Sequence, residues 1–307
     1  MIRPVLLAIA ALAVGPHVSA AQPAAPATRP DPEAIYKAAG ARASKPNVTV
    51  AYGAGPLQVA DLRLPAGRGP FPVAVVLHGG CWLASVDGRA GIAAFAEALT
   101  ARGFATWNVE YRRVGDAGGG WPGTFEDVAA AIDKLASVAP RYRLDLERLT
   151  IVGHSAGAHL ALWAASRGRL DPPWRSAIVR PASVVAIDGP GVLAPLIGPD
   201  AEECGRPVIV PLMGGTPAER PAEYRAATPA DHLPLGLRQL AVEAYMGDVM
   251  RPYVAAARAS GDSVLVLTPP RANHFDVVTP ATPNGRAVAD FVAANAFALP
   301  VAPARRR

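Results

Sequence analysis

The sequence predicts an α/β fold: a mostly parallel, eight-stranded sheet with helices on both faces. Continuously apolar segments of strand length recur along the chain, as is typical of strands covered on both sides. Segments of helical length separate them, and this alternation favours parallel pairing. A further observation, an alternating apolar–polar pattern over residues 47–64, predicts an antiparallel hairpin at one edge of the sheet.

The predicted strands follow one another along the chain. The hairpin would pair residues 47–52 with residues 57–64 across Gly53-Ala54-Gly55. The six further strands are expected at residues 71–77, 104–109, 149–152, 183–187, 240–245 and 264–267.

The predicted helices lie between these strands. A first helix at residues 92–102 would end at Gly103, and a second at about residues 125–137 would begin after Thr124, with Asp127 completing a capping box. Three more are expected at residues 158–167, 253–260 and 286–297.

The first residues have the pattern of a secretory signal peptide. Residues 1–20 combine a basic start, an apolar run too short to span a bilayer comfortably, and the small residues Val18-Ser19-Ala20 before a cleavage point. We therefore expect an exported protein, periplasmic or secreted, without a stable membrane span. An Ala/Pro-rich segment at residues 21–44, disordered to about residue 34, would lead into one domain at residues 45–298 and a basic tail at residues 299–307.

One long stretch, residues 192–234, interrupts the alternation. It is rich in proline and glycine, and loops of such length are often lids or binding segments, so it is a possible small cap. The alternative is an irregular excursion with a short helix around residues 218–227.

Composition excludes several classes of function. The net charge of +5 is modest, and no basic stripe with interleaved aromatic residues predicts nucleic-acid binding. Neither a metal-binding motif nor a cofactor-binding motif is present, so no metal and no cofactor are predicted. The partner that we expect is a small-molecule ester or amide substrate.

The sequence Gly153-His154-Ser155-Ala156-Gly157 carries the strongest functional signal. It follows a predicted strand and precedes a predicted helix, the setting of a nucleophile elbow. The two glycines would let strand and helix pass closely, so that Ser155 projects as the nucleophile. The N–H of Ala156, at the helix start, would face a developing oxyanion.

A serine nucleophile requires a base and an acid that orients the base. His274 is the candidate base, because it follows the last predicted strand, where such sheets gather their catalytic groups. Asp248, directly after the strand at residues 240–245, is the preferred acid. Asp188, which also follows a strand, is the main alternative.

The segment His78-Gly79-Gly80-Cys81-Trp82 follows the strand at residues 71–77. Its glycines would let backbone N–H groups approach a substrate oxygen, so Gly79, Gly80 and Cys81 are expected to form an oxyanion hole with Ala156. Trp82 and Trp121 could line a substrate pocket or belong to the core. If Cys81 and Cys204 pair, the bond would tie the cap to this loop; two separate thiols are the alternative.

These motifs resemble those of α/β-hydrolases of the esterase/lipase branch with an HGG oxyanion motif. More narrowly, residues 78–82, 153–160 and 273–276 resemble segments of kynurenine formamidase-like proteins, and the likeness covers roughly residues 45–298. The resemblance implies Ser155 as nucleophile, His274 as base and Asp248 as acid.

We therefore expect a serine hydrolase that cleaves small or aromatic carboxylic esters through an acyl-enzyme intermediate. Hydrolysis of the C–N bond of an aryl formamide is the alternative reaction. An inactive binding module with this fold is a third possibility, which the intact motifs oppose.

Overall fold

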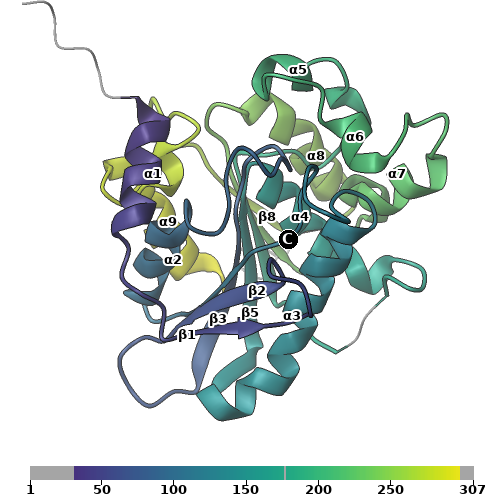
Figure 1. Ribbon diagram of the computed structural model, residues 1–307. Helices are drawn as coiled ribbons and strands as arrows, with labels where there is room; N and C mark the ends of the chain where they lie inside the picture. The colour runs from purple at the N-terminus through teal and green to yellow at the C-terminus, as the bar shows by residue number, and fades with distance from the viewer. Residues whose placement is uncertain (1–30, 176–177, 298–307) are drawn as a thin grey trace, which may run out of the picture. The chain divides into compact units, whose positions relative to one another are not determined.

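The computed structural model describes residues 31–175 and 178–297 (Figure 1), and every structural statement below concerns these residues. The predicted signal peptide at residues 1–20 and the predicted basic tail at residues 299–307 lie outside them. Within the described ranges, no helix is long and apolar enough to cross a bilayer.

The core of the domain is a single eight-stranded sheet in the order β1-β2-β4-β3-β5-β6-β7-β8. The β1–β2 and β2–β4 pairs are antiparallel and the other five pairs are parallel, which confirms the mostly parallel sheet and its edge hairpin. The strands are β1 (Val48–Ala51), β2 (Val59–Arg63), β3 (Phe71–Leu77), β4 (Ala105–Val109), β5 (Leu144–His154), β6 (Ser183–Ile187), β7 (Arg238–Val242) and β8 (Val264–Leu267).

Two strands differ from the prediction by more than two residues at one end. β5 begins five residues early, because Leu144 and Asp145 pair with Phe71 and Pro72 beyond the apolar run. β7 ends at Val242, because the backbone turns after it. This turn lets the N–H groups of Ala244 and Met246 donate to the side chain of Asp188, which follows β6.

Helices cover both faces of the sheet, as predicted. One buried apolar cluster packs α3 (Gly123–Tyr142), α4 (Ala156–Ser166) and α8 (Gly247–Ala259) on one face. The other cluster packs α1 (Pro32–Arg42), α2 (Ala93–Thr100) and α9 (Pro283–Asn295) on the opposite face, and Figure 1 shows these two groups on either side of the strands. α8 begins at Gly247, six residues before its predicted start, with Pro252 inside it.

Helix α1 corrects the expectation of disorder to about residue 34. Asp31 caps it by accepting a hydrogen bond from the N–H of Glu33, and Pro32 occupies its first turn. Tyr36 and Gly40 are buried, and a Cβ at Gly40 would overlap backbone oxygens of the segment before α2. Residues 32–42 thus form a helix that packs against the segment before α2.

The predicted capping box at the start of α3 is wrong. The helix begins at Gly123, so Thr124 lies inside it and donates its hydroxyl to the carbonyl of Arg112. Asp127 is fully buried and accepts hydrogen bonds from Arg112 and from the amide of Gln58. The side chains of both residues therefore bond to Arg112, in the segment after β4, and do not cap the N-terminus of α3.

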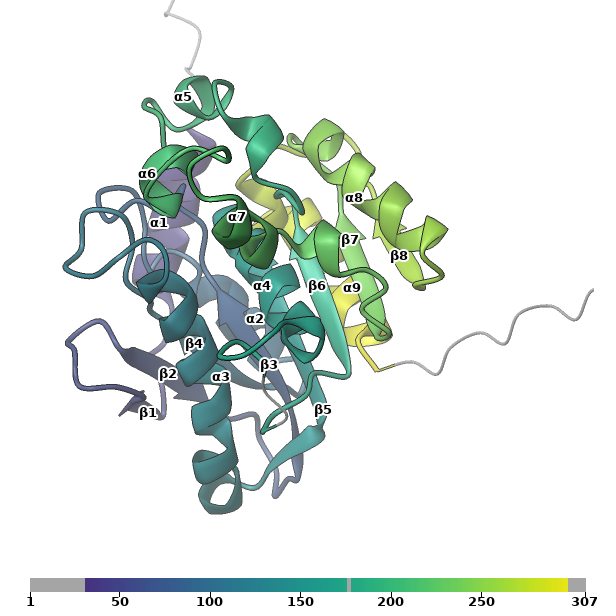
Figure 2. The same cartoon turned by 90° about the vertical axis from the view of Figure 1, so that its right-hand side faces the viewer.

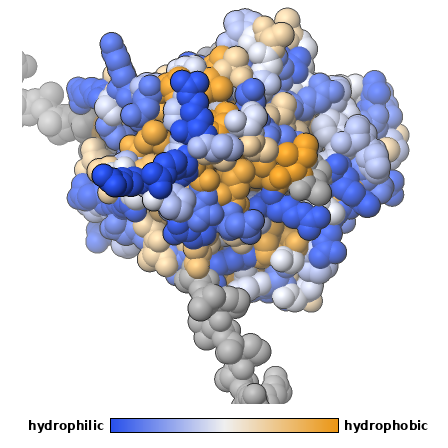
Figure 3. Space-filling view, turned by 90° about the horizontal axis from the view of Figure 1, so that it is seen from below, coloured by the Kyte–Doolittle hydropathy of each residue, from blue (hydrophilic) through white to orange (hydrophobic). Residues whose placement is uncertain are grey.

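Residues 192–234 contain short helices, which lie together at one end of the domain (Figure 2). These are η2 (Ala194–Leu196), α5 (Asp200–Glu203), α6 (Ile209–Met213), α7 (Pro221–Ala227) and η3 (Pro229–His232). Figure 3 looks at the domain from below, where hydrophobic surface is bordered by hydrophilic side chains.

Candidate active site

Ser155 stands at the turn between β5 and α4. Its backbone has φ +56° and ψ −121°, a conformation that L-residues adopt only when the surroundings enforce it. The Ser155 N–H donates to the carbonyl of Ile187 on β6 at 2.9 Å, which helps to hold the turn. The side chain is thereby fixed where strand ends and helix begins.

The glycines of the motif are required by close packing. A Cβ at Gly153 would overlap the carbonyl oxygen of Gly157, and a Cβ at Gly157 would overlap the carbonyl oxygens of Leu77 and His78. The elbow therefore lies directly against the end of β3, which brings the segment after β3 next to Ser155.

His274 is held by a buried carboxylate. Its Nδ1 lies 2.7 Å from Oδ2 of Asp188, which follows β6 and is fully buried. The other oxygen of Asp188 accepts hydrogen bonds from the N–H groups of Ala244 at 2.9 Å and Met246 at 2.8 Å. With Nδ1 occupied, Nε2 of His274 remains for proton transfer, and His274 and Ser155 line the same cavity.

The carboxylate that contacts His274 belongs to Asp188, the alternative acid, and not to Asp248, the preferred one. Asp248 lies in the first turn of α8, where its side chain is exposed and pairs with Arg251. A sequence signal for Asp188 did exist: Gly189 follows it, and a Cβ there would overlap the carbonyl oxygen of Ser155. Only a glycine lets the end of β6 approach the elbow this closely.

The predicted oxyanion segment lies beside Ser155. A Cβ on Gly79 would be 3.0 Å from Cβ of Ser155, and Gly80 and Cys81 have φ values of +102° and +54°. Among the described residues, no group accepts a hydrogen bond from the N–H of Gly80 or of Cys81. Together with the N–H of Ala156 at the start of α4, these donors are available to an oxygen bound next to Ser155.

A buried polar network supports this segment from behind. Nε2 of His78 lies 3.1 Å from the Glu110 carboxylate, and the Tyr111 hydroxyl donates to the carbonyl of His78 at 2.7 Å. Burial acts to raise the pKa of Glu110, but the hydrogen bond and charge of His78 and the charge of Arg113 lower it to about 2. The network keeps the segment in place from the end of β4.

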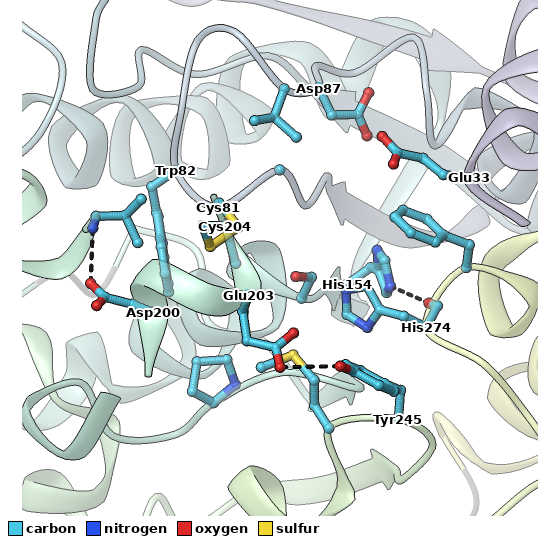
Figure 4. A pocket seen from close by; sticks show the side chains of 18 of the residues that line it. Glu33, Cys81, Trp82, Asp87, His154, Asp200, Glu203, Cys204, Tyr245 and His274 are labelled. Atoms are coloured by element: carbon cyan, nitrogen blue, oxygen red, sulfur yellow. Dashed lines mark hydrogen bonds between the residues drawn. A yellow bond between two sulfur atoms is a disulfide. The ribbon is translucent and has the colours of Figure 1, made fainter. Parts of the chain in front are cut away.

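Two histidines flank Ser155 without taking the place of the base. His154 donates from Nε2 to the carbonyl of His274 at 2.8 Å (Figure 4), and burial, with the charge of His274, lowers its pKa to about 3. His159 donates to the carbonyl of Ala227, and burial lowers its pKa to about 4. Both are therefore neutral at pH 7; His154 holds the backbone of the His274 loop.

The site opens into a cavity of about 990 Å³. Trp82 lines it, whereas Trp121 does not: its ring packs 4.9 Å from the rings of Phe125 and Trp174 in an aromatic cluster. Trp121 is thus a packing residue. The other lining residues come from the start of α1, the segments after β3, β6 and β7, the elbow, the His274 loop, and residues 192–234, which are called the cap below.

The cap is joined to the oxyanion segment by a disulfide between Cys81 and Cys204 (Figure 4). This confirms the pairing hypothesis. Next to it, Glu203 accepts a hydrogen bond at 3.1 Å from the hydroxyl of Tyr245, which follows β7. Beside the cavity, two adjacent residues thus attach the cap to the rest of the domain, and on its other side it contacts α4 through the carbonyl of Ala227. Among the described residues, no group of three His, Cys, Asp or Glu side chains is placed to hold a metal ion.

Comparison with known proteins adds a family match. The family model BD-FAE matches residues 60–234, more than half of the 307 residues. The probable isoprenylcysteine alpha-carbonyl methylesterase ICMEL1 of Oryza sativa subsp. japonica is 32% identical over 119 residues. That match covers 37% of this chain and 26% of the plant protein, so the chain spans about a quarter of that relative's length.

Solved structures share the fold. A bifunctional GH43-CE protein from Bacteroides eggerthii superposes with a TM-score of 0.65 at 22% identity, covering 81% of this chain and 38% of that one. Esterase B from Lactobacillus rhamnosis superposes with a TM-score of 0.69 at 17% identity, covering 86% and 91%. At such identities the likeness concerns the fold, and it confirms the α/β-hydrolase fold.

Proposed function

Because the chain belongs to the BD-FAE esterase family, we propose that it hydrolyses carboxylic esters through an acyl-enzyme formed on Ser155. The observation that carries this proposal is the buried Asp188–His274 pair, which shares a cavity with a serine held in a constrained turn. This arrangement has the parts that serine activation needs: a nucleophile, a base and an acid that orients the base.

In the proposed reaction, Nε2 of His274 takes the proton of the Ser155 hydroxyl as Oγ attacks the ester carbonyl carbon. Asp188 keeps the proton on Nδ1 and stabilises the imidazolium that forms. The N–H groups of Gly80, Cys81 and Ala156 donate to the resulting oxyanion; Gly79 supplies the close approach to Ser155. Collapse of the intermediate expels the alcohol, which receives its proton from His274.

Water then releases the acid. His274, neutral again, takes a proton from a water molecule that attacks the acyl carbonyl, and a second oxyanion forms in the same place. Its collapse returns the proton to Oγ of Ser155 and frees the carboxylic acid. No redox partner is consumed.

We propose small or aromatic carboxylic esters as substrates. Apolar side chains on the cap side of the cavity, among them Leu196, Val208 and Ile209, together with Trp82, suit an apolar acyl group. The second candidate is hydrolysis of an aryl formamide, which the motifs at residues 78–82 and 153–160 favour and which the same groups could perform.

We also propose that the protein works in an oxidising compartment outside the cytoplasm. The signal-peptide pattern of residues 1–20 supports export. The disulfide between Cys81 and Cys204 is compatible with such a compartment, where disulfides persist.

The test compares hydrolysis of p-nitrophenyl acetate, p-nitrophenyl butyrate and N-formylkynurenine by the purified protein and by Ser155→Ala. We expect turnover of the esters and its loss in the variant. Preference for N-formylkynurenine would promote the formamidase reaction. Ester hydrolysis that survives Ser155→Ala, or no turnover of any of the three, would contradict the proposed mechanism on these substrates and favour a binding module.

A further inference from the structure

The N-terminal helix α1 contributes directly to the walls of the active-site cavity. It precedes residues 60–234, the part of the chain that the BD-FAE family model matches. Its residue Tyr36 is almost completely buried and lines the cavity that contains Ser155 and His274. The Tyr36 ring lies 5.5 Å from the ring of Phe275, the residue after the candidate base. A helix outside the matched region therefore packs against the catalytic loop.

Within residues 31–175 and 178–297, the hydroxyl of Tyr36 has one partner, the carboxylate of Asp87, and donates to its Oδ2 at 2.8 Å. The other carboxylate oxygen accepts the N–H of Gly88 at 2.8 Å, so the side chain of Asp87 is held at both oxygens. Burial, followed by the charge of Asp87, raises the pKa of Tyr36 well above its usual value, which keeps the hydroxyl protonated as a donor.

Asp87 in turn rests against the oxyanion segment. A Cβ at Gly80 would lie 2.9 Å from Cβ of Asp87 and 3.1 Å from its backbone nitrogen, so the two backbones are in close contact. Gly80 has φ +102°, a conformation that its own sequence does not enforce, since glycine is free to adopt several others. The position of the Gly80 N–H therefore depends on what packs beside it, and Asp87 is that neighbour.

We propose that Tyr36 is a positioning residue for ester hydrolysis: through Asp87 it fixes the Gly80 N–H where the oxyanion forms. The inference rests on the proposed function and adds Tyr36 of α1 to the residues that position the oxyanion hole. Because the oxyanion exists only in the transition state and the intermediate, loss of the contact should lower kcat and leave KM nearly unchanged.

The decisive variant is Tyr36→Phe, which keeps the ring and removes the hydroxyl. We expect kcat on p-nitrophenyl butyrate to fall about 10-fold, because a slightly misplaced oxyanion donor costs less than a missing one. The reaction of Ser155 with a p-nitrophenyl alkylphosphonate, which also places negative charge in the oxyanion hole, should slow by a similar factor.

The matched control is Tyr253→Phe. Tyr253 is also buried and also donates its hydroxyl to a side chain, Gln239, at 2.8 Å, but it does not line the cavity. The two variants should lose similar stability in thermal unfolding, whereas only Tyr36→Phe should lose kcat. A double variant, Tyr36→Phe with Asp87→Ala, should lose no more kcat than Asp87→Ala alone, because the hydroxyl acts through Asp87.

Two results would overturn the inference alone: unchanged kcat in Tyr36→Phe, or an equal loss of kcat in Tyr253→Phe. Additive losses in the double variant would overturn the route through Asp87. Failure of the proposed function would look different, because the unaltered protein would then neither hydrolyse the ester nor react with the phosphonate; that result would remove both proposals.

Discussion

Asp188 is a carboxylate surrounded by donors rather than by cations. Its partners are two backbone N–H groups and the imidazole of His274, and none of the ion pairs found in the described residues joins it to an arginine or a lysine. A fully buried negative charge of this kind gains most when the imidazole next to it becomes positive. The geometry thus favours the imidazolium that proton transfer from Ser155 would create.

Replacement of Asp188 by asparagine should therefore remove most of the activity. An amide can donate to Nδ1 and impose the wrong tautomer on His274, so we expect kcat to fall by about 10⁴. The comparison is Asp248→Asn, which alters an exposed side chain paired with Arg251 and should keep kcat within about two-fold. A steady-state assay on a p-nitrophenyl ester measures kcat for both variants. A comparable loss of kcat in Asp248→Asn would contradict the assignment of Asp188 as the acid.

The buried histidines should make stability depend on pH. The pKa of His159 is about 4 in the folded protein, below the value of 6.5 expected for an unfolded chain. Between these values only the unfolded state binds the proton, so stability is lost as the pH falls from 6.5 towards 4. For His159→Gln, which retains a donor to Ala227, we expect the slope of unfolding free energy against pH to fall by about 1.4 kcal/mol per pH unit near pH 5. Urea unfolding at several pH values tests this, and an unchanged slope would refute it.

At the residue scale, the sequence predicted which serine and histidine would share a cavity better than which carboxylate would contact the histidine. Ser155 and His274 each follow a strand within a recognisable local pattern. Asp188 and Asp248 both follow strands as well, and the choice between them depends on where the chain turns after β7. That turn is set by the N–H groups of Ala244 and Met246, which bind Asp188 itself, so no local pattern reveals it.

The elements that meet at the elbow leave no room for a side chain at Gly157. Since a Cβ there would overlap backbone oxygens of Leu77 and His78, Gly157→Ala requires β3 and α4 to move apart. We expect a loss of more than about 4 kcal/mol in unfolding free energy, or failure to fold. Gly168, just beyond α4, is the control: a Cβ there meets nothing within 4 Å, and Gly168→Ala should change stability by less than about 0.5 kcal/mol. Chemical denaturation measures the unfolding free energy of both variants, and an equal loss in Gly157→Ala and Gly168→Ala would contradict the packing argument.

Strands were easier to predict than the ends of helices. The strands at residues 71–77, 183–187 and 264–267 lie where their apolar runs lie, because such runs fit only between two covered faces. Helix α1 was missed although Asp31 and Pro32 form a start signal, because the alanines and prolines before them are typical of a linker. At α3 the pattern of Thr124 and Asp127 was misleading, since tertiary contacts with Arg112 took both side chains.

On the scale of the whole domain, the disulfide joins segments that are 123 residues apart. Removing a bond that closes so long a loop should cost about 5 kcal/mol, chiefly because the unfolded chain gains freedom. We expect Cys204→Ser to lower the melting temperature and the esterase activity together, since the cap loses its attachment to the oxyanion segment. Cys81→Ser with Cys204→Ser should behave like the single variant. Activity and melting temperature equal to those of the oxidised protein would contradict this prediction.

The arrangement of the cap could not be predicted from its sequence. Its helices are short, and tertiary contacts hold them: the side chains of Val208 and Ile209 belong to the main core, and their N–H groups donate to the Asp200 carboxylate. Cysteine parity suggested that Cys204 attaches the cap to the oxyanion segment, and the folded chain contains this bond.

A cap fastened in this way has a consequence for the physical state of the substrate. In enzymes with a hinged lid, opening of the lid controls the access of the substrate to the active site. Here the bond between Cys81 and Cys204 opposes such an opening, because it holds residue 204 next to residues 78–82. The rate of tributyrin hydrolysis should therefore rise smoothly through the solubility limit, without a jump when droplets appear. A sudden increase at that limit would mean that the cap opens despite its bond.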